Sequence, residues 1–479
     1  MLHNLNLPII DTSVVTLDNT TYALITTAIP GEKLLVVQGH TNGFVGELRH
    51  SDQVMLCART PENARVLRAR LPWLQPSVLG LQTSAGFGDR LGIATPGHVQ
   101  SVRGTGVAPI FAQQSVRENT RTGRTPQQVL DDAMWGAFEA GWREPWGADA
   151  DHLKALADIE PFIAAGYTFY TIDPGDYVDD DAEEDNTATL RQKASALPWS
   201  DLRSSLNETQ QRYHRQFDIE DLPLAFDEHT LLKAVVKYGA AVAHMARMTR
   251  RIQELAGQRP FEMEISVDET RTTTALLEHF YIVSELKRLS VPFVSLAPRF
   301  VGRFEKGVDY IGDLAELEQN IAGHASIMRY FHNDYKLSLH TGSDKFEVYP
   351  ITMRHTQGLV HLKTAGTSYL EALRLIASID SSFFREIVEF ACSRYDTDRK
   401  TYHVSATLAK LPLIASLTKD QLPDLLNQFD ARQVLHVTFG SVLDTFGSRL
   451  HHLLNEHQAD YHVYIKRHFD KHLEAFRSR

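Results

Sequence analysis

From Ser77 onward, short apolar runs that are typical of strands alternate with longer amphipathic segments that are typical of helices. Strands that alternate with helices usually pair in parallel, so this order indicates an α/β fold. The strand-like runs are residues 78–83, 109–114, 167–172, 261–267, 292–297, 335–340, 359–363 and 433–438. Eight such units predict a closed (β/α)8 barrel of the TIM type, with the functional site at the C-terminal ends of the strands.

An open, doubly wound sheet is the competing arrangement. In that fold a G-x-G-x-x-G turn commonly follows the first strand and binds a dinucleotide. The sequence Gly86-Phe87-Gly88 lacks the third glycine at the right spacing. The closed barrel is therefore favoured.

Three segments stand outside the barrel pattern of residues 77–448. Residues 1–76 contain short β-type runs and predict a small N-terminal cap. An insertion at about 179–225 follows the third predicted strand and opens with the acidic run DDDAEED, which is typical of a solvated loop. Residues 449–479 predict a C-terminal helix that packs on the barrel or on another subunit, with its histidines at the surface.

The overall composition excludes several classes of protein. The net charge of −11 argues against a nucleic-acid surface, and two cysteines exclude a disulfide framework and a zinc–thiolate site. No apolar run is long enough to span a membrane, and the N-terminus lacks the basic region of a signal peptide. We therefore expect a cytoplasmic protein with a small-molecule ligand, and a homo-oligomer is an open alternative to a monomer.

Polar side chains cluster on one face of several predicted strands near their C-terminal ends. In the run FEMEISVDET, Glu264 and Asp268 alternate with apolar residues, and the run YKLSLH ends at His340. The following strand carries His361 and Lys363. Carboxylates inside a barrel are costly unless a metal ion, a basic side chain or a catalytic role accompanies them.

Glu, Asp and His on neighbouring strand ends fit a divalent metal site, with Zn, Mn, Co or Ni as the candidate ions. We expect Glu264, His340 and His361 as the ligands. The reserve ligands are Asp173, Asp268 and His436, and the catalytic candidates are Asp173, Asp268 and Lys363. The alternative is an interior network in which Lys336 and Lys363 neutralise the carboxylates.

Three loops carry arginines and are suited to an anionic substrate. The first, GFGDRLGIATPGH, supplies Asp89, Arg90 and His98, and Arg299 ends the fifth predicted strand. The loop SVRENTRTGR supplies Arg117, Arg121 and Arg124. Arginine pairs with carboxylate or phosphate through two parallel hydrogen bonds, so these loops favour a substrate with one of those groups.

Four of these segments together resemble the tagaturonate/fructuronate epimerases. They are GFGDRLGIATPGH (86–98), the Asp-Pro-Gly-Asp turn at 173–176, EISVDET (264–270) and LHTGSDKFEVYP (339–350). The resemblance implies interconversion of D-tagaturonate and D-fructuronate, which are 5-keto-hexonates, with the help of a divalent metal. It also implies a possible 4-epimerisation of ketohexoses such as fructose and tagatose.

The chemistry of this reaction constrains the mechanism. The carbon to be inverted lies β to the ketone, so the ketone does not acidify its C–H bond. Retro-aldol cleavage, rotation of the aldehyde and re-addition would invert this carbon with the help of a Lewis acid and a base. Transient oxidation by a nicotinamide is the other route, and the missing dinucleotide fingerprint disfavours it.

Two other functions fit the same residues. A metal-dependent aldolase or ketose isomerase could use the same site and would release fragments or an aldose. A non-catalytic sugar-acid binding protein would hold the ligand without turnover.

Overall fold

A computed structural model describes residues 7–49, 54–220 and 222–477 and shows a closed barrel of eight parallel strands. The order around the barrel follows the chain, and the last strand pairs with the first. The predicted fold class is thereby confirmed. The barrel strands are β6 (Ser84–Gly86), β7 (Ala108–Ser115), β8 (Gly147–Leu153), β9 (Phe169–Ile172), β12 (Glu262–Ser266), β13 (Ser295–Ala297), β14 (Lys336–Leu339) and β15 (Val360–Lys363).

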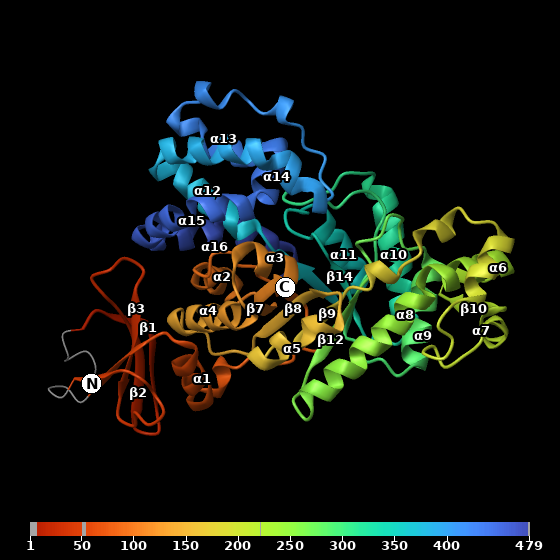
Figure 1. The fold of residues 1–479 in the computed structure, drawn as a ribbon, viewed down its shortest axis with the longest axis horizontal. Coiled ribbons are helices and arrows are strands. Elements are labelled where there is room, and N and C mark those ends of the chain that lie inside the picture. Colours follow the sequence, from red (N-terminus) through yellow and green to blue (C-terminus); the bar gives the residue numbers. More distant parts are fainter. Residues whose placement is uncertain (1–6, 50–53, 221, 478–479) are drawn as a thin grey trace.

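Helices connect consecutive strands and surround the barrel (Figure 1). Their buried faces carry mainly Leu, Ile, Val, Ala and aromatic side chains, which join one continuous core with the outward faces of the strands. The helices that follow barrel strands are α2 (Thr95–Val102), α3 (Val116–Thr122), α4 (Pro126–Glu139), α5 (Leu156–Ala165), α8 (Glu228–Ala256), α9 (Leu276–Arg288), α10 (Leu314–Tyr330), α11 (Val348–Thr356) and α12 (Thr367–Ile379).

Three strand assignments from the sequence were wrong. The run 433–438 lies in helix α14 (Phe429–Val437), which is buried on nearly all sides and therefore has the composition of a buried strand. The first barrel strand is β6, not the run 78–83, which forms a loop beneath it. The sequence reading also missed β8, so the strand expected as third is the fourth barrel strand.

The N-terminal residues form a separate antiparallel sheet at one end of the molecule (Figure 1). Its order is β1-β2-β3-β5-β4, and helix α1 (Pro61–Arg70) links it to the barrel. Thr60 caps this helix by accepting a hydrogen bond from the Asn63 amide, as the Thr-Pro start predicts. The strands are β1 (Ile9–Leu17), β2 (Thr20–Thr26), β3 (Lys33–Gln38), β4 (Glu47–Arg49) and β5 (Val54–Ala58).

The insertion follows β9 and contains α6 (Thr187–Ser195), α7 (Leu206–Tyr213) and the hairpin β10 (Gln216–Ile219) with β11 (Leu222–Ala225). It lies at the opposite end of the molecule from the N-terminal sheet (Figure 1). The acidic run is paired with basic groups of two elements. Lys193 bridges Asp179 and Asp185, and the backbone amide of Arg271 donates to Asp180. These contacts fasten the insertion to the loop that follows β12.

The C-terminal helices α13 (Ser381–Asp398), α14, α15 (Phe439–Glu456) and α16 (Gln458–Leu473) pack beside the barrel. The expectation that the histidines of this region lie at the surface was wrong for three of them. His462, His468 and His472 are at most 8% exposed because α16 presents that face to α2, α12 and the loop after β14. Within the described ranges, every helix is too short or too polar to cross a lipid bilayer.

Candidate active site

A cavity of about 400 Å³ opens at the C-terminal ends of the barrel strands, where the barrel fold places function. Its walls come from helix α3, which directly follows β7, from the loops after β12, β13 and β14, and from the segment 401–405 after α13. Charged and polar side chains supply much of the lining, including Arg117, Asp268, Glu269, Lys306 and His340.

An irregularity in strand β8 places His152 at this site. The pairing of β8 with β9 shifts register between Ala150 and Leu153, as at a β-bulge. Within it, His152 adopts a left-handed backbone conformation, with φ of 53°. Such a conformation is uncommon for a residue other than glycine, and it often occurs at functional sites. The bulge turns His152 toward the barrel mouth instead of the helical layer.

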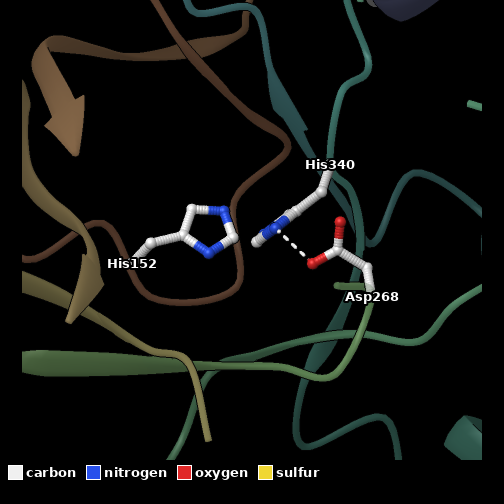
Figure 2. A group of neighbouring side chains, drawn as sticks. All are labelled: His152, Asp268 and His340. Atoms are coloured by element: carbon white, nitrogen blue, oxygen red, sulfur yellow. Dashed lines mark ion pairs between the residues drawn. The ribbon is translucent and has the colours of Figure 1, made fainter. Parts of the chain in front are cut away.

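Asp268 and His340 face His152 from the opposite side of the mouth. His340 follows β14, and Asp268 follows β12, so both lie where the strands end. The Nδ1 atom of His340 lies 3.0 Å from Oδ1 of Asp268, and Ser266 donates to the same oxygen at 2.5 Å. The two imidazole rings stand nearly edge to face, with centroids 5.0 Å apart. Figure 2 shows the ring of His340 between His152 and Asp268.

A carboxylate orients each of the two imidazoles from behind. Asp173 accepts a hydrogen bond from Nδ1 of His152 at 3.1 Å, and Glu264 lies 2.6 Å from Nε2 of His340. The second nitrogen of His340 therefore faces Asp268, and the ring of His152 lies against the same space. One ligand atom each of His152, Asp268 and His340 fits within 4.8 Å of the others. In many metal sites a carboxylate orients the histidine ligand in the same way, through the ring nitrogen that does not bind the metal.

The charge around His340 favours a cation at this position. Burial alone would lower the pKa of His340, but Asp268 and Glu264 together raise it to about 10. Burial would raise the pKa of Asp268, yet the neighbouring His340 holds it well below its ordinary value. Two carboxylates thus stabilise positive charge on the imidazole between them.

A second layer lies deeper in the barrel and contains Lys363. Its Nζ atom lies 2.8 Å from Asp149, 2.6 Å from Asp151 and 2.8 Å from Glu264. Burial would lower the pKa of Lys363, but these three carboxylates raise it well above its ordinary value. Lys363 is therefore a buried ammonium that neutralises part of the interior charge, as the alternative interior network predicts. Lys336, the other lysine of that alternative, donates to the Gln82 carbonyl and the Ser84 hydroxyl.

The predicted arginines differ in how free they are to bind a substrate. Arg90 donates twice to Glu118 and once to the carbonyl of His436, and it stacks on Phe439. Arg299 lines the cavity, but its guanidinium donates to the backbone carbonyls of the loop after β12. Arg117 donates one hydrogen bond to the carbonyl of Thr401 at 3.1 Å, has a loose ion pair at 3.5 Å to Glu269, and lines the cavity. The neighbouring Arg121 and Arg124 make hydrogen bonds within the protein.

Four other predicted residues lie away from the cavity. Asp89 accepts three backbone hydrogen bonds in the turn before α2, and His98 packs against Phe469 in the core. His361 bonds to Ser84 inside the barrel, and its side chain is in none of the potential metal-binding groups. His436 is buried in helix α14 beside Arg90, because its segment is not a barrel strand.

Sequence reasoning missed His152, Glu269 and Lys306. The run Ala-Asp-Ala-Asp-His at 148–152 carries a period of two, with aspartates on one face, and could have revealed strand β8. Glu269 directly follows Asp268 and lies within reach of His152 and Asp173. Nothing in the local sequence distinguishes Lys306, because only the fold brings its loop to the cavity.

A closed parallel barrel with these reactive side chains at its C-terminal mouth defines an enzyme of the TIM-barrel type. A family model described as tagaturonate epimerase matches residues 10–476. The chain is 41% identical over 450 residues to a tagaturonate/fructuronate epimerase from Thermotoga maritima, with 92% of each chain covered. The chain belongs to this epimerase family and is thus an enzyme of the isomerase class.

Solved structures agree with this assignment. The native crystal structure of the fructuronate-tagaturonate epimerase UxaE from Cohnella laeviribosi superimposes with a TM-score of 0.93 at 36% identity, covering 99% of this chain and 97% of that one. A complex of the same protein with one glycerol gives a TM-score of 0.92 at 37% identity, with the same coverage.

Proposed function

We propose that this enzyme interconverts D-tagaturonate and D-fructuronate with a divalent metal ion bound by His152, Asp268 and His340. One observation carries the proposal: two imidazoles, each oriented by its own carboxylate, converge with Asp268 at the mouth of the barrel. The proposed activity is supported by the family to which the chain belongs, and the proposed metal site is supported by the positions of the donor atoms. This set replaces Glu264 and His361, which we expected from strand alternation.

The residues fit a divalent ion by the chemistry of their donors. Two imidazole nitrogens and a carboxylate oxygen are the ligands that Zn, Mn, Co and Ni accept, and three protein ligands leave positions open for a substrate. Among the described residues the carboxylate of Asp268 pairs with His340 and Ser266 at the mouth, and with no Lys or Arg. When bound, the ion would supply Lewis acidity that lowers the cost of negative charge on the ketone oxygen of the substrate.

We propose retro-aldol chemistry for the inversion. A base removes the proton of the hydroxyl on the carbon β to the ketone, and the bond between the α and β carbons breaks. The β carbon becomes an aldehyde, and the bonding electrons pass to the ketone fragment as an enolate. Rotation of the aldehyde presents its other face, and re-addition with return of the proton gives the epimer.

We propose Glu269 as the base. Its carboxylate lines the cavity and lies close to His152 and Asp173. Its ion pairs with the described residues are both long, at 3.5 Å to Arg117 and 3.4 Å to Lys154. Asp173 is buried and bonded to His152, so we assign it the positioning of that ring. Lys363 would balance the carboxylates below the reacting carbons.

Neutral ketohexoses present the same ketone and β-hydroxyl as the uronates. We propose that fructose and tagatose undergo the same inversion more slowly, because they lack the carboxylate that contributes to binding.

The test is an assay with both uronates before and after removal of metal. We expect a chelator to abolish epimerisation and Zn, Mn, Co or Ni to restore it. In D₂O the epimer should carry no deuterium on carbon, because retro-aldol chemistry moves no C–H proton. Full activity in protein shown by elemental analysis to be metal-free would overturn the metal assignment. Solvent deuterium on carbon would contradict the retro-aldol mechanism and would indicate proton transfer at carbon, as in a ketose isomerase.

A further inference from the structure

Lys306 lies where two cavities of the active site meet. A smaller cavity, of about 20 Å³, reaches down to His152 and Lys363, beneath the 400 Å³ cavity. Both cavities are lined by Arg117, Lys306, His340, Thr341 and Tyr402. A molecule bound in the larger cavity beside Asp268 and His340 therefore shares that cavity with the Lys306 side chain.

The loop that carries Lys306 is fastened on both sides of this residue. The carboxylate of Glu305 accepts hydrogen bonds from Ser405 and Gln433, at 2.7 and 2.8 Å. The carbonyl of Gly307 accepts from Arg432 at 2.5 Å. Buried Lys345 donates to the carbonyl of Glu305 at 2.9 Å and to that of Val308. The backbone around Lys306 is therefore held in place before a ligand arrives, which reduces the entropic cost of binding.

The Lys306 side chain itself has no hydrogen bond and no ion pair within 4.0 Å to any described residue. It is nevertheless half-buried, and burial and nearby Arg117 lower its pKa more than the carboxylates of Glu118, Glu269 and Asp151 raise it. A partly buried cation without a direct partner is less favourable than one that is paired. The arrangement becomes favourable once an anion binds.

The larger cavity is lined by groups of both charges. Asp268 and Glu269 supply carboxylates, and Arg117, which lies 3.5 Å from Glu269, supplies a cation together with Lys306. Arg90 is held by two hydrogen bonds to Glu118, and Arg299 donates to two backbone carbonyls. Arg117 donates to one backbone carbonyl, and its buried Nε has no hydrogen-bond partner among the described residues. We infer that Lys306, together with Arg117, binds the carboxylate of the substrate and so makes the enzyme prefer a hexonate over a neutral sugar. This inference rests on the proposed uronate substrate.

The test compares Lys306→Met with Lys306→Arg in the metal-loaded enzyme. With the uronate substrate, Lys306→Met should raise KM roughly 10- to 100-fold, the range expected for a lost charge-assisted hydrogen bond, and should leave kcat within about threefold. Lys306→Arg should recover most of the affinity. Lys193→Met, which removes a lysine paired on the distant insertion, should behave as wild type.

Direct binding separates this inference from the proposed reaction. Calorimetric titration with D-gluconate and with D-glucitol compares a carboxylate with the matching alcohol. We expect Lys306→Met to weaken gluconate binding by the same 10- to 100-fold factor and to leave glucitol binding within about twofold. This result would support the inference even if wild type failed to epimerise uronates. Equal losses for both ligands, or a fall in kcat at unchanged KM, would overturn it.

Discussion

Two clusters among the described residues each combine two histidines and one aspartate. One lies at the barrel mouth and consists of His152, Asp268 and His340. The other joins helix α16 to the turn after β14 and consists of Asp344, His468 and His472. The donor types are identical, and in both clusters the ligand atoms lie within 4.8 Å of one another. Composition and spacing therefore do not distinguish them.

The hydrogen bonds behind the donors do distinguish them. At the mouth, each imidazole has one nitrogen bonded to a carboxylate outside the cluster, and the second nitrogen of His340 pairs with Asp268 inside it. In the second cluster, His472 uses both nitrogens within the protein. Its Nδ1 donates to the carbonyl of His468, and its Nε2 accepts from the Asp344 amide at 2.9 Å. Arg432 holds Asp344 at 2.8 Å. We therefore assign the second cluster a structural role.

The surrounding charge points the same way. Two carboxylates raise the pKa of His340 to about 10, whereas burial lowers the pKa of His468 and of His472 to about 3. The first cluster favours a cation, and the second keeps its imidazoles neutral. A potential metal site must thus be judged by the groups that contact its donors, as well as by the donors themselves.

The largest expected effect comes from His340→Gln. Loss of a metal ligand should lower kcat by several orders of magnitude while the fold survives, since the glutamine still fits between Asp268 and Glu264. Assays of both uronates and a thermal melt beside metal-free wild type would test this. Near-normal turnover with a full complement of metal would remove His340 from the site.

A smaller effect is expected for Asp173→Asn, which keeps the size of the side chain that orients His152. Loss of an orienting carboxylate typically costs about 10- to 100-fold in metal affinity or activity. Titration of the metal-free variant with Zn should show the weaker binding, and excess Zn should restore part of the activity. Unchanged metal affinity would mean that Asp173 does not orient a ligand.

The smallest effect concerns stability and His472→Gln. Because burial lowers the pKa of His472 from 6.5 to about 3, the unfolded chain binds a proton that the folded chain excludes between these values. This contribution is complete above about pH 6.5 and falls by about 1.4 kcal/mol per pH unit as the pH drops toward 3. Glutamine does not titrate, so the melting temperatures of variant and wild type should converge from pH 7 to pH 5. A constant difference would contradict the assignment.

Much of the fold follows from the sequence, because long amphipathic helices and apolar strands carry strong periodic signals. Runs such as 335–340 and 359–363 contain strands β14 and β15. The expected number of barrel strands, eight, was right, but the expected set included a segment of the buried helix α14 and omitted β8. Strand β8 has alanines outside and aspartates inside, so it lacks the branched apolar residues by which strands are usually recognised.

The site was harder to predict than the fold. Strand alternation correctly turned Glu264 and His361 into the barrel, but it gives no depth along the barrel axis. Both side chains lie below the mouth, whereas Asp268 and His340 lie at it. His152 depends on a bulge with positive φ, which no local pattern announces. The buried histidines of α16 acquire their environment only through contacts with the turn after β14.

The most direct test of the central claim is the metal content of three proteins purified in the same way: wild type, His340→Gln and His468→Gln. If the barrel mouth binds the ion and the α16 cluster does not, elemental analysis will find about one divalent ion per chain in wild type and in His468→Gln. It will find almost none in His340→Gln. A full complement in His340→Gln together with loss of the ion in His468→Gln would contradict the claim.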